Sequence, residues 1–193
     1  MPKTILQKEE KVLRAIAKEV PIHDIKKPKI KKILKEMSDS LKTQNDGVAI
    51  AAPQIGYSLR IFLVSGKVFS GNFVDDRKER IEKKHGEGTY IPDAPDTDKA
   101  ASSRDLVFIN PKISKLSREK EWMPEGCLSV RPLYGKTFRS KKATITAHDE
   151  NGKKFTRGGS GLLAQIFQHE TDHLNGILFI DHAKDVKEEA QLK

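Results

Sequence analysis

The stretch SGLLAQIFQHETDHLNG, residues 160–176, predicts the helix around which we expect the rest of the chain to be built. Its apolar side chains recur at the spacing of one helical face, at Leu162, Leu163, Ile166, Phe167 and Leu174. Ser160 is a residue type that caps helices at the amino end, and Asn175-Gly176 supplies a left-handed stop at the carboxyl end. The sequence therefore predicts one well-delimited helix between these two signals.

Two histidines of this helix form a metal-binding pattern. His169 and His173 are four residues apart, so both imidazoles leave the same face and can bind one metal ion. Glu170 lies beside them, where its carboxylate can reach a water molecule at such a metal. Two histidines at chance spacing are the weaker interpretation, because the pattern lies on a well-delimited helix. The motif therefore predicts a catalytic metal site.

A catalytic site of this kind needs a third protein ligand. Phe179 occupies the position where metzincin proteases have a third histidine, and Glu188 and Glu189 lie close to the end of the sequence. The remaining candidate is Cys127, within PEGCLS at 124–129, because a metal stabilises the thiolate that binds it. Alone this cysteine would be interpreted as a buried thiol, but beside the histidine pair it is the expected third ligand.

The order of the other elements predicts the fold class. Apolar periodicity and turn residues predict a short turn at Val12–Ala17, a helix at Pro28–Thr43, an apolar run at Val48–Ala52, strands at Leu59–Val64 and Leu106–Asn110, β-prone stretches towards Trp122, a hairpin of Ala143–Ala147 with Lys153–Thr156, a short buried strand at Ile177–Ile180, and a partly helical tail from Asp181. Strands in series with two helices outside strict alternation predict an α+β fold, with antiparallel β-sheets packed around the central metal-binding helix and a further helix near the N-terminus.

Residues 66–104 differ in composition from their surroundings. They carry 8 basic and 8 acidic residues and only isolated apolar side chains. Such a segment buries too little apolar area to offset its ordering entropy, so we expect a surface insertion. A small hairpin of Val68-Phe69 and Phe73-Val74 is the alternative. Apart from this insertion, residues 1–193 are expected to form a single domain.

Composition and charge exclude several classes of protein. The chain has 193 residues, one cysteine and a net charge of +9. No apolar run reaches the ~18 to 20 residues of a membrane span, and one cysteine excludes a disulfide framework. The lysines are scattered without interleaved aromatic residues, which favours a solvated surface over a specific nucleic-acid site. We therefore expect a non-membrane protein, without a presequence in this sequence and without a specific nucleic-acid partner.

Three segments in fixed order resemble the peptide deformylase family. They are GVAIAAPQ at 47–54, EGCLS at 125–129 and QHETDHL at 168–174. That family consists of metal-dependent hydrolases that remove the formyl group from the amino-terminal methionine of newly made polypeptides. The resemblance runs from about Ile5 to Ala183, apart from residues 66–104.

The resemblance implies a role for each matching residue. It assigns the metal to Cys127, His169 and His173. It makes Glu170 the general base and acid, and it makes the side chain of Gln54 and the backbone amide of Leu128 the donors that stabilise the oxyanion. These roles suit formamide hydrolysis, because the reaction passes through a tetrahedral oxyanion and needs proton transfer.

The resemblance also implies where the substrate binds. The peptide would lie as an added strand beside the backbone of residues 48–50, and its methionine would enter an apolar pocket beside the catalytic helix. The residues implied in substrate binding are Val48, Ala49, Ile50, Gly126, Leu162 and Ile166. Ala49 stands where the family usually has glycine, so a methyl group lies close to the expected path of the substrate.

The ligand set leaves the metal open. One cysteine and two histidines suit one divalent ion of zinc, iron, cobalt or nickel, and the resemblance favours Fe(II) in the working enzyme. The implied partners are formyl-methionyl nascent peptides, with transient proximity to the ribosome. We expect a monomer. Translation that starts with formyl-methionine places the protein in an organelle of bacterial descent, such as a plastid-type organelle, an apicoplast or a mitochondrion, or alternatively in a bacterial cytoplasm.

Two other functions are compatible with parts of the pattern. One is an RNA-binding or ribosome-binding protein stabilised by a structural metal, but such a site closes with four protein ligands and only three are in motif context here. The other is a peptidase of the HExxH type. Release of formate without internal cleavage of a formyl-methionyl peptide would separate these alternatives from a deformylase.

Overall fold

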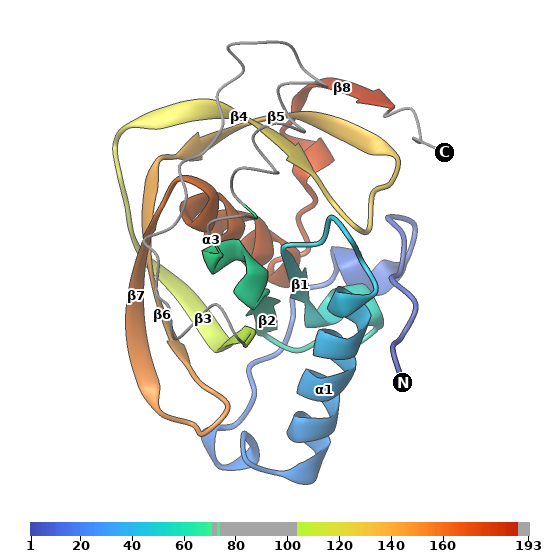
Figure 1. Ribbon diagram of the computed structural model, residues 1–193, viewed down its shortest axis with the longest axis vertical. Helices are drawn as coiled ribbons and strands as arrows, with labels where there is room; N and C mark the ends of the chain where they lie inside the picture. Colours follow the sequence, from blue (N-terminus) through green and yellow to red (C-terminus); the bar gives the residue numbers. More distant parts are fainter. Residues whose placement is uncertain (71–72, 74–103, 189–193) are drawn as a thin grey trace.

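Two antiparallel sheets and two α-helices make up the fold, in a computed structural model that describes residues 1–70, 73 and 104–188 (Figure 1). The five-stranded sheet has the order β1-β2-β3-β6-β7 and the three-stranded sheet the order β4-β5-β8. The strands are β1 (Ala49–Ala51), β2 (Ile61–Val64), β3 (Leu106–Leu116), β4 (Lys120–Gly126), β5 (Leu133–Ser140), β6 (Lys142–His148), β7 (Lys154–Ser160) and β8 (Lys184–Glu188). The helices are α1 (Pro28–Lys42) and α3 (Gly161–Leu174). The predicted α+β class is confirmed.

At β1 and β2 the five-stranded sheet is buried on both faces. Along β2, Phe62 packs with the apolar residues of α3, whereas its neighbour Leu63 packs with those of α1. Successive residues of a strand point to opposite faces, so this short strand contributes to two cores. Phe108 stacks on Phe62 with ring centroids 4.6 Å apart and meets Phe167 of α3 edge-on at 5.4 Å. These rings fix α3 against the sheet, with the three-stranded sheet on its far side (Figure 1).

Several predicted elements are confirmed with small changes of boundary. The helix predicted at Pro28–Thr43 is α1 and ends one residue earlier. The predicted hairpin is β6-β7, and Gly152 in its turn has a φ of 75°. Ser160 lies at the N-cap of α3, but its side chain makes no capping hydrogen bond. The strand β7 leads directly into the helix there, and the N–H of Gly161 donates to the carbonyl of Lys141 instead.

The prediction for the end of the chain is wrong in two places. Ile177–Ile180 is not a strand: its buried residues Leu178 and Phe179 enter an apolar cluster, and a 3-10 helix spans Phe179–Asp181. The apolar run therefore indicated correctly that Leu178 and Phe179 are buried, but it did not indicate the type of secondary structure. Within the tail predicted as partly helical from Asp181, Lys184–Glu188 forms β8, which pairs with β5, and residues 189–193 lie outside the described residues. All five residues of β8 are exposed, so the strand has no apolar alternation by which the sequence could have revealed it.

The start of the predicted insertion belongs to the core. Gly66–Phe69 is a 3-10 helix, in which Val68 and Phe69 are buried in the same cluster as α3, so Val68-Phe69 is not a hairpin strand. Phe73 also packs against this cluster. Residues 71–72 and 74–103, the rest of the predicted insertion, lie outside the described residues. The single-domain organisation stays a prediction.

The segment before α1 closes over the end of α3. A 3-10 helix spans Lys11–Arg14 and overlaps the short turn predicted at Val12–Ala17. The N–H of Ala17 donates to the carbonyl of Leu174 at 2.9 Å. Gly176 has a φ of 75°, and a Cβ there would lie 2.6 Å from the carbonyl oxygen of Arg14. Only glycine fits at this position, because the positive φ disfavours any other residue and the carbonyl of Arg14 leaves no room for a side chain.

No helix in the described part of the chain has the length and apolar character needed to cross a membrane.

Candidate metal centre

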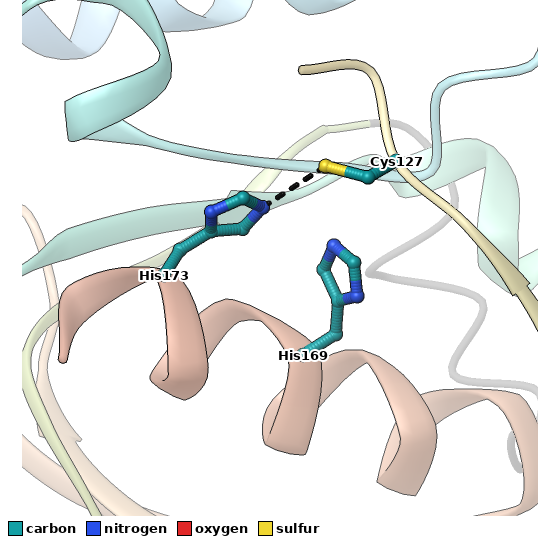
Figure 2. Close-up of side chains that lie close together, drawn as sticks. All are labelled: Cys127, His169 and His173. Carbon is teal, nitrogen blue, oxygen red and sulfur yellow. Dashed lines mark hydrogen bonds between the residues drawn. The ribbon is translucent and has the colours of Figure 1, made fainter. Parts of the chain in front are cut away.

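Cys127, His169 and His173 meet in the interior between the two sheets (Figure 2). Their candidate ligand atoms all lie within 4.8 Å of one another, and Cys127 Sγ is 3.2 Å from His173 Nε2. The histidines rise one turn apart from α3, and the cysteine directly follows β4. The fold thus brings together the three residues that the sequence predicts as metal ligands.

Hydrogen-bond donors surround the sulfur. The N–H of Ser129 donates to Cys127 Sγ at 3.4 Å, and Gln54 Nε2 lies 3.7 Å from the same atom. Gln54 is held at both ends of its amide, because Oε1 accepts from the N–H of Ala51 at 2.8 Å and Nε2 donates to Ser129 Oγ at 3.0 Å. Such donors can hydrogen-bond to the charged sulfur of a metal-bound cysteine. Gln54, predicted as an oxyanion donor, therefore lies at the metal centre.

The position before the cysteine admits no side chain. A Cβ on Gly126 would lie 2.6 Å from the ring of Tyr134 on the neighbouring strand. Real Cβ atoms do not approach this closely, so a larger residue would displace either the ring or the backbone that presents Cys127. Gly126, implied in substrate binding by the resemblance, has this packing requirement in the structure.

A buried carboxylate orients His169. Its Nδ1 lies 2.7 Å from Glu125 Oε1, which leaves Nε2 as the ring nitrogen available for the metal. Arg139 forms a forked ion pair with Glu125, with Nη2 2.7 Å from Oε1 and Nε 3.1 Å from Oε2. Burial alone would raise the pKa of Glu125, but the charges and hydrogen bonds of His169 and Arg139 hold that pKa well below its usual value. Glu125 is therefore ionised at neutral pH.

Further side chains complete this network. Thr137 Oγ1 donates to Glu125 at 2.7 Å, and Gln165 Nε2 donates to it at 3.2 Å. Arg139 Nη1 donates to Asp172 Oδ2 at 2.6 Å, so the network also contacts α3, at a residue between the two histidines. The members of this network were not predicted as site residues: Glu125, Thr137, Arg139, Gln165 and Asp172. The only signal was that Thr137 and Arg139 alternate along one strand, and that strand was not predicted.

His173 has a different environment. Its side chain is buried, and Nδ1 has no hydrogen-bond partner within the described part of the chain. Burial, together with the charge of His169, holds the pKa of His173 well below its ordinary value. The ring is therefore neutral at pH 7, which is the form in which imidazole binds a metal.

Glu170 has the properties of a proton carrier. The residue is buried, and its Oε2 has no hydrogen-bond partner among the described residues. Burial raises the pKa of Glu170 to about 7; His169 opposes this rise, and Glu125 and Asp172 add to it. A carboxyl group with a pKa near the working pH can both accept and donate a proton.

The donor set fits a divalent transition metal. A thiolate and two imidazoles are typical ligands of zinc, iron, cobalt and nickel, and three protein ligands leave a position open for a reactant. Neutral His173, the N–H of Ser129 directed at Cys127 Sγ and the unpaired buried oxygen of Glu170 all agree with such an ion. The predicted metal ligands therefore form a possible metal site.

The other predicted residues are Leu128, beside the cysteine, and the residues implied in substrate binding, which lie in two apolar clusters. The N–H of Leu128, next to the cysteine, donates to no acceptor in the described ranges. Val48, Ala49, Leu162 and Ile166 share one apolar cluster. Ile50 is buried in the other cluster, against α1, so its side chain does not join them. Its backbone belongs to β1, which pairs only with β2 in the described sheet and is therefore an edge strand.

Comparison with known proteins gives consistent matches over the chain. A sequence profile for polypeptide deformylase matches residues 2–189. A peptide deformylase 2 from Clostridium acetobutylicum is 36% identical over 174 residues, which cover 90% of this chain and 89% of the relative. A peptide deformylase from Borreliella burgdorferi is 37% identical over 165 residues, covering 86% and 79% of the two chains.

Solved structures show the same similarity in three dimensions. A peptide deformylase from Legionella pneumophila superposes with a TM-score of 0.70 at 31% identity, covering 96% of this chain and 88% of that one. An actinonin-bound class I type b peptide deformylase from Acinetobacter baumannii gives a TM-score of 0.73 at 26% identity, covering 95% and 99%.

The fold and the site together are those of a metal-dependent hydrolase. The chain belongs to the polypeptide deformylase family. It is an enzyme that removes the formyl group from the amino terminus of newly made polypeptides.

Proposed function

We propose that this chain hydrolyses formyl-methionyl peptides at one divalent metal held by Cys127, His169 and His173, with Glu170 as the general base and acid. The observation that carries the proposal is the convergence of three ligand atoms within 4.8 Å beside a buried carboxyl group whose pKa is raised to about 7. When bound, the metal supplies Lewis acidity, which polarises the formyl carbonyl and lowers the pKa of the attacking water.

Glu170 manages the protons of this reaction. Its carboxylate accepts a proton from the attacking water, and its protonated form then donates to the amine that leaves. A pKa of about 7 suits both steps, because each protonation state is populated near neutral pH. Burial also keeps bulk water from competing for the carboxylate.

Gln54 and Leu128 stabilise the negative charge that develops on the formyl oxygen. Gln54 Nε2 lies 3.7 Å from Cys127 Sγ, and Leu128 presents its N–H from the next residue along the chain. The amide of Gln54 is fixed before substrate binds, since Ala51 and Ser129 hold its two ends. Fixed donors are effective because they need no reorganisation during the reaction.

The substrate peptide extends the five-stranded sheet in this proposal. β1 is an edge strand in the described sheet, so its outer backbone groups can pair with an extended peptide. The methionine side chain would then lie against Val48, Leu162 and Ile166, which share one apolar cluster. The methyl group of Ala49 belongs to the same apolar cluster, so we expect it to lie close to the bound substrate.

The test is formate release from a formyl-Met-Ala-Ser peptide by protein reconstituted anaerobically with Fe(II) or, separately, with Zn(II). We propose Fe(II) as the working metal and therefore expect the faster turnover with iron. An acetyl-Met-Ala-Ser peptide is the matched control and should release no acetate at a comparable rate. Internal cleavage without formate would contradict the proposal in favour of a peptidase, and faster turnover with zinc would contradict the choice of iron.

A further inference from the structure

The two strands that support the metal centre also carry a very different outer face. Along β4 and β5, Glu125, Thr137 and Arg139 point inward to the network behind His169. Trp122 and Phe138 occupy alternate positions of the same strands and are exposed, with 38% and 50% of their surface accessible. Large exposed aromatic side chains on a sheet are unusual where no partner covers them.

Trp122 and Phe138 form a continuous aromatic surface. They are direct register partners on β4 and β5, so both lie on the same face of the three-stranded sheet. Their ring centroids are 5.2 Å apart, with an angle of 37° between the planes. The two rings therefore offer neighbouring π-faces that are held by backbone pairing.

Lysines surround this aromatic surface. Lys184 of β8 places Nζ 4.8 Å from the ring centroid of Trp122, and Lys120 places Nζ 5.9 Å from that of Phe138. Lys136 lies two residues from Phe138 on the same face and pairs with exposed Asp185 at 3.7 Å. These three lysines against one aspartate leave two positive charges around the rings. Lys187 and Glu188 at the end of β8 cancel each other.

The linear sequence does not show that these aromatic and basic side chains lie together. Trp122, Phe138 and Lys184 are far apart along the chain, and only the strand order β4-β5-β8 brings them to one face. Lysines without interleaved aromatic residues indicate a solvated surface, but the fold interleaves them in space. Aromatic rings flanked by cations on an open sheet are typical of surfaces that bind single-stranded nucleic acid.

We propose that this outer face of β4-β5-β8 binds single-stranded RNA without sequence preference. Bases stack on Trp122 and Phe138, and the phosphates on either side pair with Lys120, Lys136 and Lys184. The ammonium groups that lie over the rings move to the phosphates when bases take their place. Lys120 and Lys184 therefore lie beside an aromatic ring in the free protein and beside a phosphate in the complex, and both groups attract a cation.

The geometry favours RNA over a membrane surface. Side chains that insert into a bilayer interface enter it by about 5–10 Å, which requires rings that project beyond the charged groups around them. Here Lys184 and Lys120 lie over the ring faces instead. The net positive charge around the rings disfavours a second copy of the same face, because like charges would meet in a twofold contact.

The single tryptophan of the chain allows a direct test. The metal-loaded protein is titrated with an unlabelled 12-nucleotide oligoadenylate while tryptophan fluorescence is recorded, and affinity is measured separately by the anisotropy of a fluorescein-labelled copy. We expect saturable quenching, since Trp122 is the only source of the signal. A double-stranded RNA of the same length should bind more weakly, because its bases are not available for stacking.

Variants of this face should weaken binding in two distinguishable ways. Phe138→Ala should raise the dissociation constant by about 5- to 100-fold, the range for the loss of one stacked base. Lys184→Ala should reduce the slope of log affinity against log salt by about 0.7. The matched controls are Ile16→Ala, an exposed apolar residue elsewhere, and Lys29→Ala on α1. Formate release by each variant serves as the check of folding.

Four outcomes would overturn the proposal. The first is the absence of saturable quenching up to about 1 mM oligonucleotide, well above the usual range for non-specific binding. The second is an equal loss of affinity in Ile16→Ala. The third is a blue shift of Trp122 emission with vesicles of 70% phosphatidylcholine and 30% phosphatidylserine, without quenching by RNA. The fourth is a dimer in sedimentation velocity that Phe138→Ala abolishes.

Discussion

The two histidines of the proposed metal centre lie one helical turn apart and differ in what holds each ring in place. His169 has a charged network behind it, in which Glu125 contacts Nδ1 at 2.7 Å and Arg139 holds Glu125. His173 has no hydrogen-bond partner for Nδ1 within the described residues and is held by burial, with Cys127 beside Nε2.

This difference indicates two ways of fixing a metal ligand. A carboxylate behind an imidazole selects its tautomer and increases its basicity, at the cost of burying charge that needs partners of its own. Close packing fixes a ring without that charge, and burial keeps the ring neutral. The His169 side should therefore be sensitive to polar substitutions far from the metal, whereas the His173 side should be sensitive to changes of packing.

Removal of the cysteine ligand, which lies beside both histidines, should have the largest effect on metal binding and activity. Cys127→Ala leaves two imidazoles, which hold a divalent ion far more weakly than three ligands do. We expect loss of bound metal after gel filtration, measured by inductively coupled plasma mass spectrometry, together with loss of deformylation. Stoichiometric, tightly held metal in this variant would show that the cysteine is not a ligand.

Glu170→Ala should separate catalysis from metal binding. All three ligands remain, so we expect a folded, metal-loaded protein whose kcat is lower by about 100- to 10,000-fold, the usual contribution of a general acid–base group. Metal content and formate release are measured on the same preparation. A kcat within about tenfold of the parent would contradict the assigned role.

Glu125→Gln should make the His169 side resemble the His173 side. The amide keeps the shape of the carboxylate but loses the charge that supports the imidazole, so metal affinity should fall by about 10- to 100-fold. Competition with a chelator measures this change. Glu119→Gln is the matched control, because it makes the same change in the exposed ion pair of Glu119 with Lys141, where we expect little effect on metal affinity. Equal affinity in both variants would mean that the network does not act on the metal.

Thr137→Val should have the smallest effect of these four substitutions, and it allows the two faces of β5 to be compared. It removes one hydrogen bond to Glu125 without changing the size of the side chain, which lowers the free energy of unfolding by about 1.5–3 kcal/mol. Urea denaturation measures the change. Phe138→Ala alters the next residue on the opposite face and should leave metal affinity unchanged. An equal loss of metal in both variants would show that the two faces of β5 are not independent.

The sequence predicted those parts of the molecule whose signals are local. The helix at 160–176 carries its apolar face, its stop signal and both histidines within one stretch, so its place and its chemistry were predicted together. Cys127 was identified by elimination and by the resemblance, and the structure places it beside the histidines. Family membership is shown by relatives over most of the chain.

The missed features depend on strand pairing. Arg139 is one charged residue among many in the sequence, and its role follows only from the pairing of β5 with β4 and the approach of α3. β8 pairs through its backbone while its side chains stay exposed, so its composition resembles that of a tail. The metal, the compartment and the oligomeric state stay predictions, because ligand types and surface charge do not determine them.

The contact of the N-terminal segment with α3 has a consequence for protein engineering. Ala17 bonds the last carbonyl of α3, Gly176 lies against Arg14, and Arg14 pairs with Asp181 at 2.6 Å. A truncation through residue 17 would therefore uncover the end of the helix that carries His173. Purification tags and fusion partners are better joined ahead of residue 1, because the N–H of Leu6 also donates to the carbonyl of Gln54 at 2.9 Å.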